Sequence, residues 1–110
     1  MSRGASALRR HAPVFAALGD ETRLSLVAKL CDAAPCSITR LAAGSRITRQ
    51  AVTKHLRVLE GAGIVRGVRS GRQVLFELDP APLEAVRDYL SQVSRQWDVL
   101  LSRLKDFVER

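Results

Sequence analysis

A regular repeat of apolar residues near the C-terminus constrains this sequence more than any other feature. From position 83 onward they recur in steps of three and four, and the series is Leu83, Val86, Leu90, Val93, Trp97, Leu100, Leu104 and Phe107. Such spacing, sustained over several heptads, predicts one long helix with an apolar seam along one side. Asp79 is suited to cap this helix, and Pro80 and Pro82 fall where a first helical turn tolerates proline.

The predicted helix, residues 80–108, is long for a chain of 110 residues. At 1.5 Å per residue it would extend about 40 Å, whereas a globule of this size has a radius of gyration of about 13 Å. Part of the seam should therefore lie beyond the rest of the fold. We expect the seam of a second copy to cover it in a homodimer. The alternative is a helix that folds back, so that the seam is core of its own chain.

Four shorter helices are expected before the long one. They are Arg9–Leu18, a second helix that Asp20 caps and Pro35 stops, Ser37–Ala43 and Thr48–Glu60. The first has Pro13 near its first turn or bends there. Apolar spacing assigns the inward faces of the second and fourth helices, which are Leu24, Val27, Ala28 and Cys31 in the former and Val52, Leu56 and Leu59 in the latter.

Two β-rich runs, Ile64–Val68 and Gln73–Leu78, follow these helices, and turn residues Arg69–Arg72 lie between them. They predict one small antiparallel hairpin that packs on the helices. The expected fold is mainly helical with this hairpin, in the α+β class. At 12.1 kDa, residues 1–110 should form a single domain.

The third and fourth helices, separated by a break at residues 44–47, predict a helix-turn-helix. This motif places its second helix in the major groove of DNA, N-terminus first. The distribution of charge along the chain also favours binding to DNA. The net charge is +7, and residues 45–73 carry seven basic residues against the single acid Glu60. Basic charge concentrated in one segment indicates a polyanionic partner. The alternative is a basic face that only contacts solvent.

Side chains on the outer side of the fourth helix have the chemistry to read DNA bases. Arg49 can address guanine and Gln50 adenine, each in a bidentate way. Thr53 can form a hydrogen bond or touch a thymine methyl group. Lys54 and Arg57 suit phosphates or a neighbouring base edge.

Other residues of this region should bind the DNA backbone. Thr48 begins the helix, where its hydroxyl and nearby N–H groups can hold a phosphate. Arg69 and Arg72 border the hairpin turn, which fits a wing reaching the adjacent minor groove or backbone. The expected DNA-binding set is Arg46, Thr48, Arg49, Gln50, Thr53, Lys54, Arg57, Arg69 and Arg72.

The sequence resembles the ArsR/SmtB family of winged-helix bacterial repressors. Three stretches carry the resemblance: FAALGDETRLSLVAKL at 15–30, ITRQAVTKHLRVLEGAGIV at 47–65, and SGR followed by VLFEL at 70–78. The resemblance implies a homodimer that binds an operator, commonly near its own gene, and represses transcription. It also implies dimerisation through the first and last helices.

Many members of that family release DNA on binding a metal, but this chain departs from their ligand patterns. Where the family has Cys-x-Cys near the third helix, the sequence offers Cys36 followed by Ile38. The last helix of this chain has none of the histidines that the family uses as metal ligands there. We therefore expect no metal site and no cofactor. Cys31 and Cys36 are expected to be ordinary buried thiols, with a redox switch as the alternative, and His55 to pack or contact a phosphate.

No enzyme signature is present, and no apolar run could span a bilayer or serve as a secretory signal. The sequence predicts a cytoplasmic, sequence-specific repressor that binds double-stranded DNA as a dimer, over a pseudo-palindromic operator. Two alternatives remain open: a thiol- or metal-responsive sensor, and a winged helix that docks an acidic protein partner.

Overall fold

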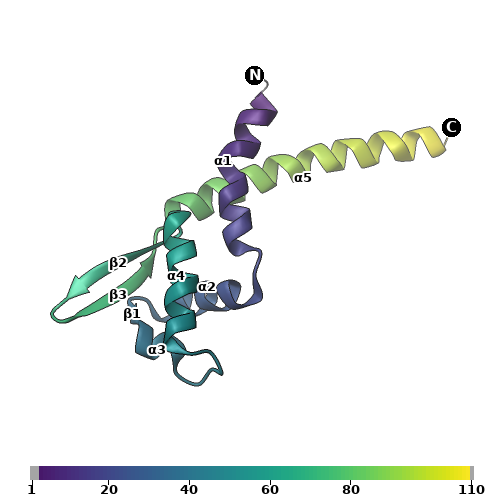
Figure 1. Ribbon diagram of the computed structural model, residues 1–110. Helices are drawn as coiled ribbons and strands as arrows, with labels where there is room; N and C mark the ends of the chain where they lie inside the picture. The colour runs from purple at the N-terminus through teal and green to yellow at the C-terminus, as the bar shows by residue number, and fades with distance from the viewer. Residues whose placement is uncertain (1–2, 110) are drawn as a thin grey trace.

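The computed structural model describes residues 3–109, with side chains from residue 6 onward. In that range, helices dominate and a small sheet lies to one side (Figure 1). The elements are α1 (Arg3–Leu18), α2 (Glu21–Ala33), β1 (Cys36–Ser37), α3 (Ile38–Ala42), α4 (Arg49–Gly61), β2 (Val65–Ser70), β3 (Gln73–Leu78) and α5 (Pro80–Val108). The predicted fold class, mainly α with a small antiparallel hairpin, is confirmed.

Helix α1 begins earlier than the sequence suggested. It starts at Arg3 and contains Pro13 in its interior, so the expectation of a proline near the first turn is wrong. Ala5, Ala7 and Leu8 favour helix and extend it upstream. Pro13 is exposed, so the carbonyl that loses its helical donor there can be hydrated.

The core lies where α2, α3 and α4 meet the base of the sheet. The side chains with less than 2% exposure are Leu26, Leu30, Leu41, Leu56, Leu59, Ile64 and Val52. The inward face predicted for α4 is confirmed. The face predicted for α2 is wrong except at Val27, which packs against the core: Leu26 and Leu30 are buried, whereas Leu24 is 52% exposed and Cys31 is exposed. Two apolar stripes with helical spacing run along this short helix. The stripe that contains Leu26 and Leu30 is the one that packs into the core.

The sheet has three strands in the order β1-β3-β2, all antiparallel. The hairpin of β2 and β3 was predicted, but its turn is shorter than expected, because Arg69 and Ser70 pair with β3. Gly71 in the turn has a φ of +61°. Strand β1 was not predicted. In it, Cys36 pairs with Phe76 and Ser37 pairs with Leu75. Two residues are too few to show an alternating pattern. Strand β1 ties the start of α3 to the hairpin.

Helix α5 begins as predicted, with the Asp79 carboxylate accepting a hydrogen bond from the Ala81 backbone N–H at 3.1 Å. It crosses α1 and then projects away from the other elements (Figure 1). The described residues extend 67 × 32 × 20 Å, with a radius of gyration of 18.4 Å. The seam is covered only near its start: Val86 is 6% exposed, Trp97 56% and Phe107 73%. The helix therefore does not fold back on its own chain.

Candidate nucleic-acid interface

Helices α3 and α4 form the predicted helix-turn-helix, and each begins at a capped residue. The Ser37 hydroxyl accepts from the Arg40 backbone N–H, and the Thr48 hydroxyl accepts from the Ala51 backbone N–H, both at 3.1 Å. These bonds satisfy donors that the first helical turn leaves free. The caps fix where α4 starts, and therefore which N–H groups it presents at its N-terminus.

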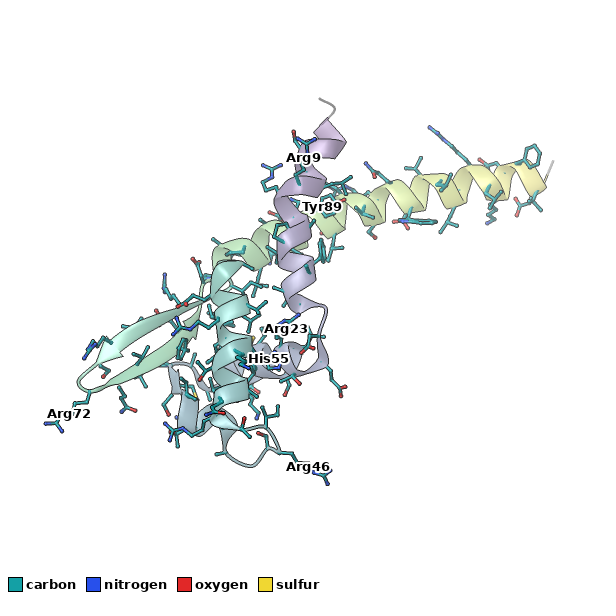
Figure 2. All side chains as sticks on the ribbon, in the orientation of Figure 1. Arg9, Arg23, Arg46, His55, Arg72 and Tyr89 are labelled. Carbon is teal, nitrogen blue, oxygen red and sulfur yellow. The ribbon has the colours of Figure 1, made fainter. Side chains whose placement is uncertain are left out.

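The turn between the two helices is closed by its own hydrogen bonds. The Ser45 hydroxyl donates to the Ala42 carbonyl at 2.9 Å and accepts from the Ile47 N–H at 3.3 Å. Gly44 has a φ of +74°, in the left-handed region that glycine tolerates best. Arg46 extends outward from this turn (Figure 2).

The outer side of α4 carries the residues that the sequence analysis assigned to base recognition. Arg49, Gln50 and Lys54 are exposed. Burial of Val52 and Leu56, at 0% and 1% exposure, fixes the rotation of the helix that presents them. The polar side chains at the N-terminal end of α4 are thus free to meet a ligand.

Thr53 is more restricted than its sequence position suggested. It is half-buried, and its hydroxyl donates to the Arg49 carbonyl at 2.8 Å. Such a bond back to the preceding turn is common for helical threonine. The Thr53 hydroxyl can therefore accept a hydrogen bond from DNA while this bond lasts, but it has no proton left to donate.

Arg57 lies further along α4 and is loosely paired. Its guanidinium is 4.0 Å from the Glu60 carboxylate, and 76% of its side chain is exposed. An exposed pair at this distance constrains the side chain little. Arg57 borders a cleft of about 280 Å³ between α4 and the hairpin, and Phe76 and Val74 form part of its apolar wall.

The hairpin carries three arginines in two different settings. Arg69 and Arg72 are exposed near the turn, and Arg72 points away from the fold at the hairpin tip (Figure 2). Arg66 instead donates to the Glu77 carboxylate at 2.7 Å across the two strands. That hydrogen bond, together with the charge of Glu77, raises the pKa of Arg66.

The local sequence around His55 does not indicate which way its ring points. Its ring does not join the outer row of α4 but turns toward α2, where Nδ1 lies 3.5 Å from a guanidinium nitrogen of Arg23 and 3.9 Å from the Asp20 carboxylate. Of the two roles expected of His55, packing agrees with this position, in which the ring faces α2. No local pattern reveals the contact, because Arg23 and His55 are 32 positions apart.

The cysteines do not form a pair. Both are free thiols; Cys36 is buried, as predicted, and Cys31 is exposed on α2, contrary to prediction. In the described part of the chain, no three side chains of His, Cys, Asp or Glu cluster closely enough to hold a metal ion. No helix in that part is long and apolar enough to cross a membrane.

This arrangement defines a winged helix-turn-helix, in which α4 is the recognition helix and the β2–β3 hairpin is the wing. Residues 18–68 match a family model described as a helix-turn-helix domain. The HTH-type transcriptional regulator Rv2034 of Mycobacterium tuberculosis is 31% identical over 93 residues, which cover 84% of this chain and 83% of that protein.

Solved structures agree with this assignment. An ArsR-like transcriptional regulator from Rhodococcus sp. RHA1 is 34% identical with a TM-score of 0.84, over 99% of this chain and 97% of that one. The homodimeric winged helix-turn-helix domain Mb0332 of Mycobacterium bovis has a TM-score of 0.67 at 21% identity, with 90% of each chain covered, and it supports the fold alone. The chain belongs to the ArsR family of winged-helix DNA-binding transcriptional regulators.

Proposed function

We propose that the protein is a dimeric repressor that binds a pseudo-palindromic operator through α4 and its wing. The observation that carries this proposal is the exposed polar row at the N-terminal end of α4. Arg49 and Gln50 lie there, on a helix whose rotation the buried Val52 and Leu56 fix. In this assignment Arg49, Gln50, Thr53 and Lys54 read the sequence, and Thr48 holds a phosphate at the helix start.

The remaining cations of the set position the protein on the DNA backbone. They are Arg46, Arg57, Arg69 and Arg72. Arg46 at the helix-turn-helix turn and Arg72 at the wing tip both point outward, whereas Arg9 on α1 lies away from them (Figure 2). A recognition helix between two such cations suits a groove lined by phosphates on both edges.

The uncovered part of α5 supports assembly through its seam. Leu90, Trp97, Leu100 and Leu104 are between 49% and 56% exposed. Large apolar side chains in a continuous row on one helix favour a matching row on a second copy. The proposed interface comprises Leu83, Val86, Leu90, Val93, Trp97, Leu100, Leu104 and Phe107. The Mycobacterium bovis neighbour is homodimeric, which agrees with this assembly.

Two-fold symmetry then sets the form of the DNA site. Two recognition helices about 34 Å apart, one turn of B-DNA, would meet successive major grooves and read a pseudo-palindrome. Residues 1–110 act in this scheme as one winged-helix domain with residues 80–108 as its dimerisation helix. The site of action is the cytoplasm.

We further propose that DNA release does not use the usual metal sites of the family. Ile38 stands where a second thiolate is needed, and α5 has no histidine. The exposed Cys31 favours a second candidate, a thiol-responsive repressor. Stoichiometric zinc in the purified protein would contradict the first assignment. A reversible loss of DNA affinity with peroxide, abolished by Cys31→Ser, would support the second.

A fluorescence-anisotropy titration tests the main proposal. A duplex from upstream of the protein's own gene is compared with a scrambled duplex at several salt concentrations. We expect the native duplex to bind about a thousandfold tighter, with a log–log salt slope of several units. Equal, weak binding of every upstream duplex tried would contradict the repressor assignment and favour docking of an acidic protein on the basic face.

A further inference from the structure

Three polar side chains meet at the junction of α1 and α2, beside the middle of α4. They are Asp20, the N-cap of α2; Arg23, in the first turn of α2; and His55, on α4. Figure 2 shows Arg23 and His55 close together, between the end of α1 and the middle of α4. The cluster lies on the side of α4 that faces the fold, not on the row proposed to read bases.

Arg23 connects two helices through one guanidinium. Its Nε donates to the Ala17 carbonyl at 2.5 Å, and one terminal nitrogen donates to the Ala16 carbonyl at 3.3 Å. These carbonyls belong to the last turn of α1, and the Ala16 carbonyl also accepts from the Gly19 backbone N–H at 3.3 Å. The other terminal nitrogen lies 3.5 Å from His55 Nδ1. The planar guanidinium thus spans from the end of α1 to the recognition helix.

The contact between Arg23 and His55 depends on the proton state of the ring. A guanidinium can only donate, so Nδ1 of His55 must accept, which requires a neutral imidazole with its proton on Nε2. A protonated imidazole has donors at both nitrogens and cannot accept from Arg23. Only 26% of the His55 side chain is exposed, so solvent screens the two cations incompletely.

Two charged groups of α2 face His55, and they act in opposite directions. Arg23 repels a protonated ring, and Asp20, with its carboxylate 3.9 Å from Nδ1, attracts it. The hydrogen bond from the Arg23 backbone N–H lowers the pKa of Asp20, so the carboxylate is available as an anion. On α4 itself, the neighbouring Lys54 and Arg57 are exposed on the outer side.

We propose that Arg23 is a positioning residue for the recognition helix, and that protonation of His55 releases its contact and weakens operator binding. The protonated ring no longer accepts from Arg23 and interacts with Asp20 instead. Helix α4 then loses its link to the end of α1. This inference rests on the proposed function, since it requires α4 to bind the operator. It adds a response to pH, because histidine is the side chain that ordinarily gains a proton on mild acidification.

The test measures the ratio of operator to scrambled-duplex affinity from pH 8.0 to pH 5.5 at constant ionic strength. A ratio removes the general gain in DNA affinity that protonated groups bring at low pH. We expect the ratio of the wild-type protein to fall about tenfold over this range, the size of one lost hydrogen bond to a charged group. His55→Asn should hold the ratio constant, because its amide oxygen lies two bonds from Cβ, as Nδ1 does, and accepts from Arg23 at every pH.

Arg23 has its own variant and its own control. Arg23→Lys keeps the charge but loses the planar fork, so at pH 8.0 we expect its ratio to be about tenfold lower. Arg87→Lys makes the same change on an exposed side chain of α5 and should match the wild type. Thermal unfolding of each variant at pH 8.0 shows that the protein measured is folded.

The chain has two histidines, so His11→Gln identifies which ring is responsible. We expect His11→Gln to keep the pH response and His55→Asn to lose it. A wild-type ratio that is constant with pH, or a response lost in His11→Gln alone, would overturn the inference while leaving operator binding intact. Failure of the wild type to discriminate the two duplexes at pH 8.0 would instead overturn the proposed function, and this inference with it.

Discussion

Arg66 and Glu77 face each other across the wing, with the guanidinium Nε 2.7 Å from a carboxylate oxygen and the two residues in direct register. This pair divides the arginines of the hairpin into two kinds. Arg66 is neutralised by a partner on the next strand, whereas Arg72 at the turn points into solvent. A count of positive charge along the sequence treats them as equal, but their roles in binding DNA should differ.

We predict that Arg72→Ala weakens binding to operator and scrambled DNA alike. The log–log salt slope should decrease by about one for each wing that loses a phosphate contact. Arg66→Ala is the matched control, because it removes the same side chain from the same hairpin but from an existing ion pair. It should leave the slope nearly unchanged. A loss confined to the operator in Arg72→Ala would mean that the wing reads bases.

The recognition helix should respond differently to the loss of a base contact. We predict that Arg49→Ala costs about 1–3 kcal/mol on the operator and reduces discrimination between the two duplexes. Arg87→Ala, on an exposed part of α5, controls for the loss of one positive charge. The measurement is anisotropy with operators mutated at single positions. Equal losses on operator and scrambled DNA would move Arg49 to the phosphate-binding group.

The parts of the fold that were predicted are those that a local pattern determines. Thr48 caps α4, and Val52, Leu56 and Leu59 repeat at helical spacing on a segment with no competing apolar stripe. The prediction of the inward face of α2 was wrong for the opposite reason. Leu26 and Leu30 compete there with a second stripe of equal periodicity, and only contacts with α4 and the sheet decide between them.

Features that depend on contacts between distant segments were not predictable. Strand β1 is defined by pairing of Cys36 with Phe76, and its two residues carry no pattern of their own. The orientation of His55 likewise depends on Asp20 and Arg23, which lie on another helix. In the candidate site, exposure of Arg49 follows from the helix period. The pairing of Arg66 could have been suspected only once the register of the hairpin was known.

The N-cap of α2 predicts a response of stability to acid. The folded state lowers the pKa of Asp20 from its ordinary 3.8, first through the Arg23 backbone N–H. The ionised form is therefore favoured by folding. This contribution is present above the unfolded pKa and is lost as the pH falls through the lower, folded value.

We therefore expect wild-type protein to resist urea better than Asp20→Asn at pH 7.0, with the difference shrinking as the pH falls below about 3.8. Asparagine can still cap a helix, so this variant removes the charge and keeps the cap. The free energy of unfolding is compared at equal protein concentration at each pH. A difference that stayed constant down to pH 2.5 would show that the charge of Asp20 does not contribute.

The exposed part of the α5 seam predicts a variant that separates assembly from folding. Leu100 and Leu104 are 55% and 56% exposed, so a charge there should disturb little within one chain. It should strongly oppose a seam-to-seam interface, where a carboxylate would be buried without a partner. We predict that Leu100→Glu is a folded monomer in sedimentation equilibrium, with the helical circular dichroism of its other elements retained.

Ser102→Glu is the matched control, because it adds the same charge to the opposite side of the same helix. It should sediment as the wild type does. If assembly sets the spacing of two recognition helices, Leu100→Glu should also lose operator affinity and keep its weak affinity for scrambled DNA, since each remaining monomer still presents one basic face. A dimeric Leu100→Glu with normal operator affinity would place the interface on another surface and leave the seam without its proposed role.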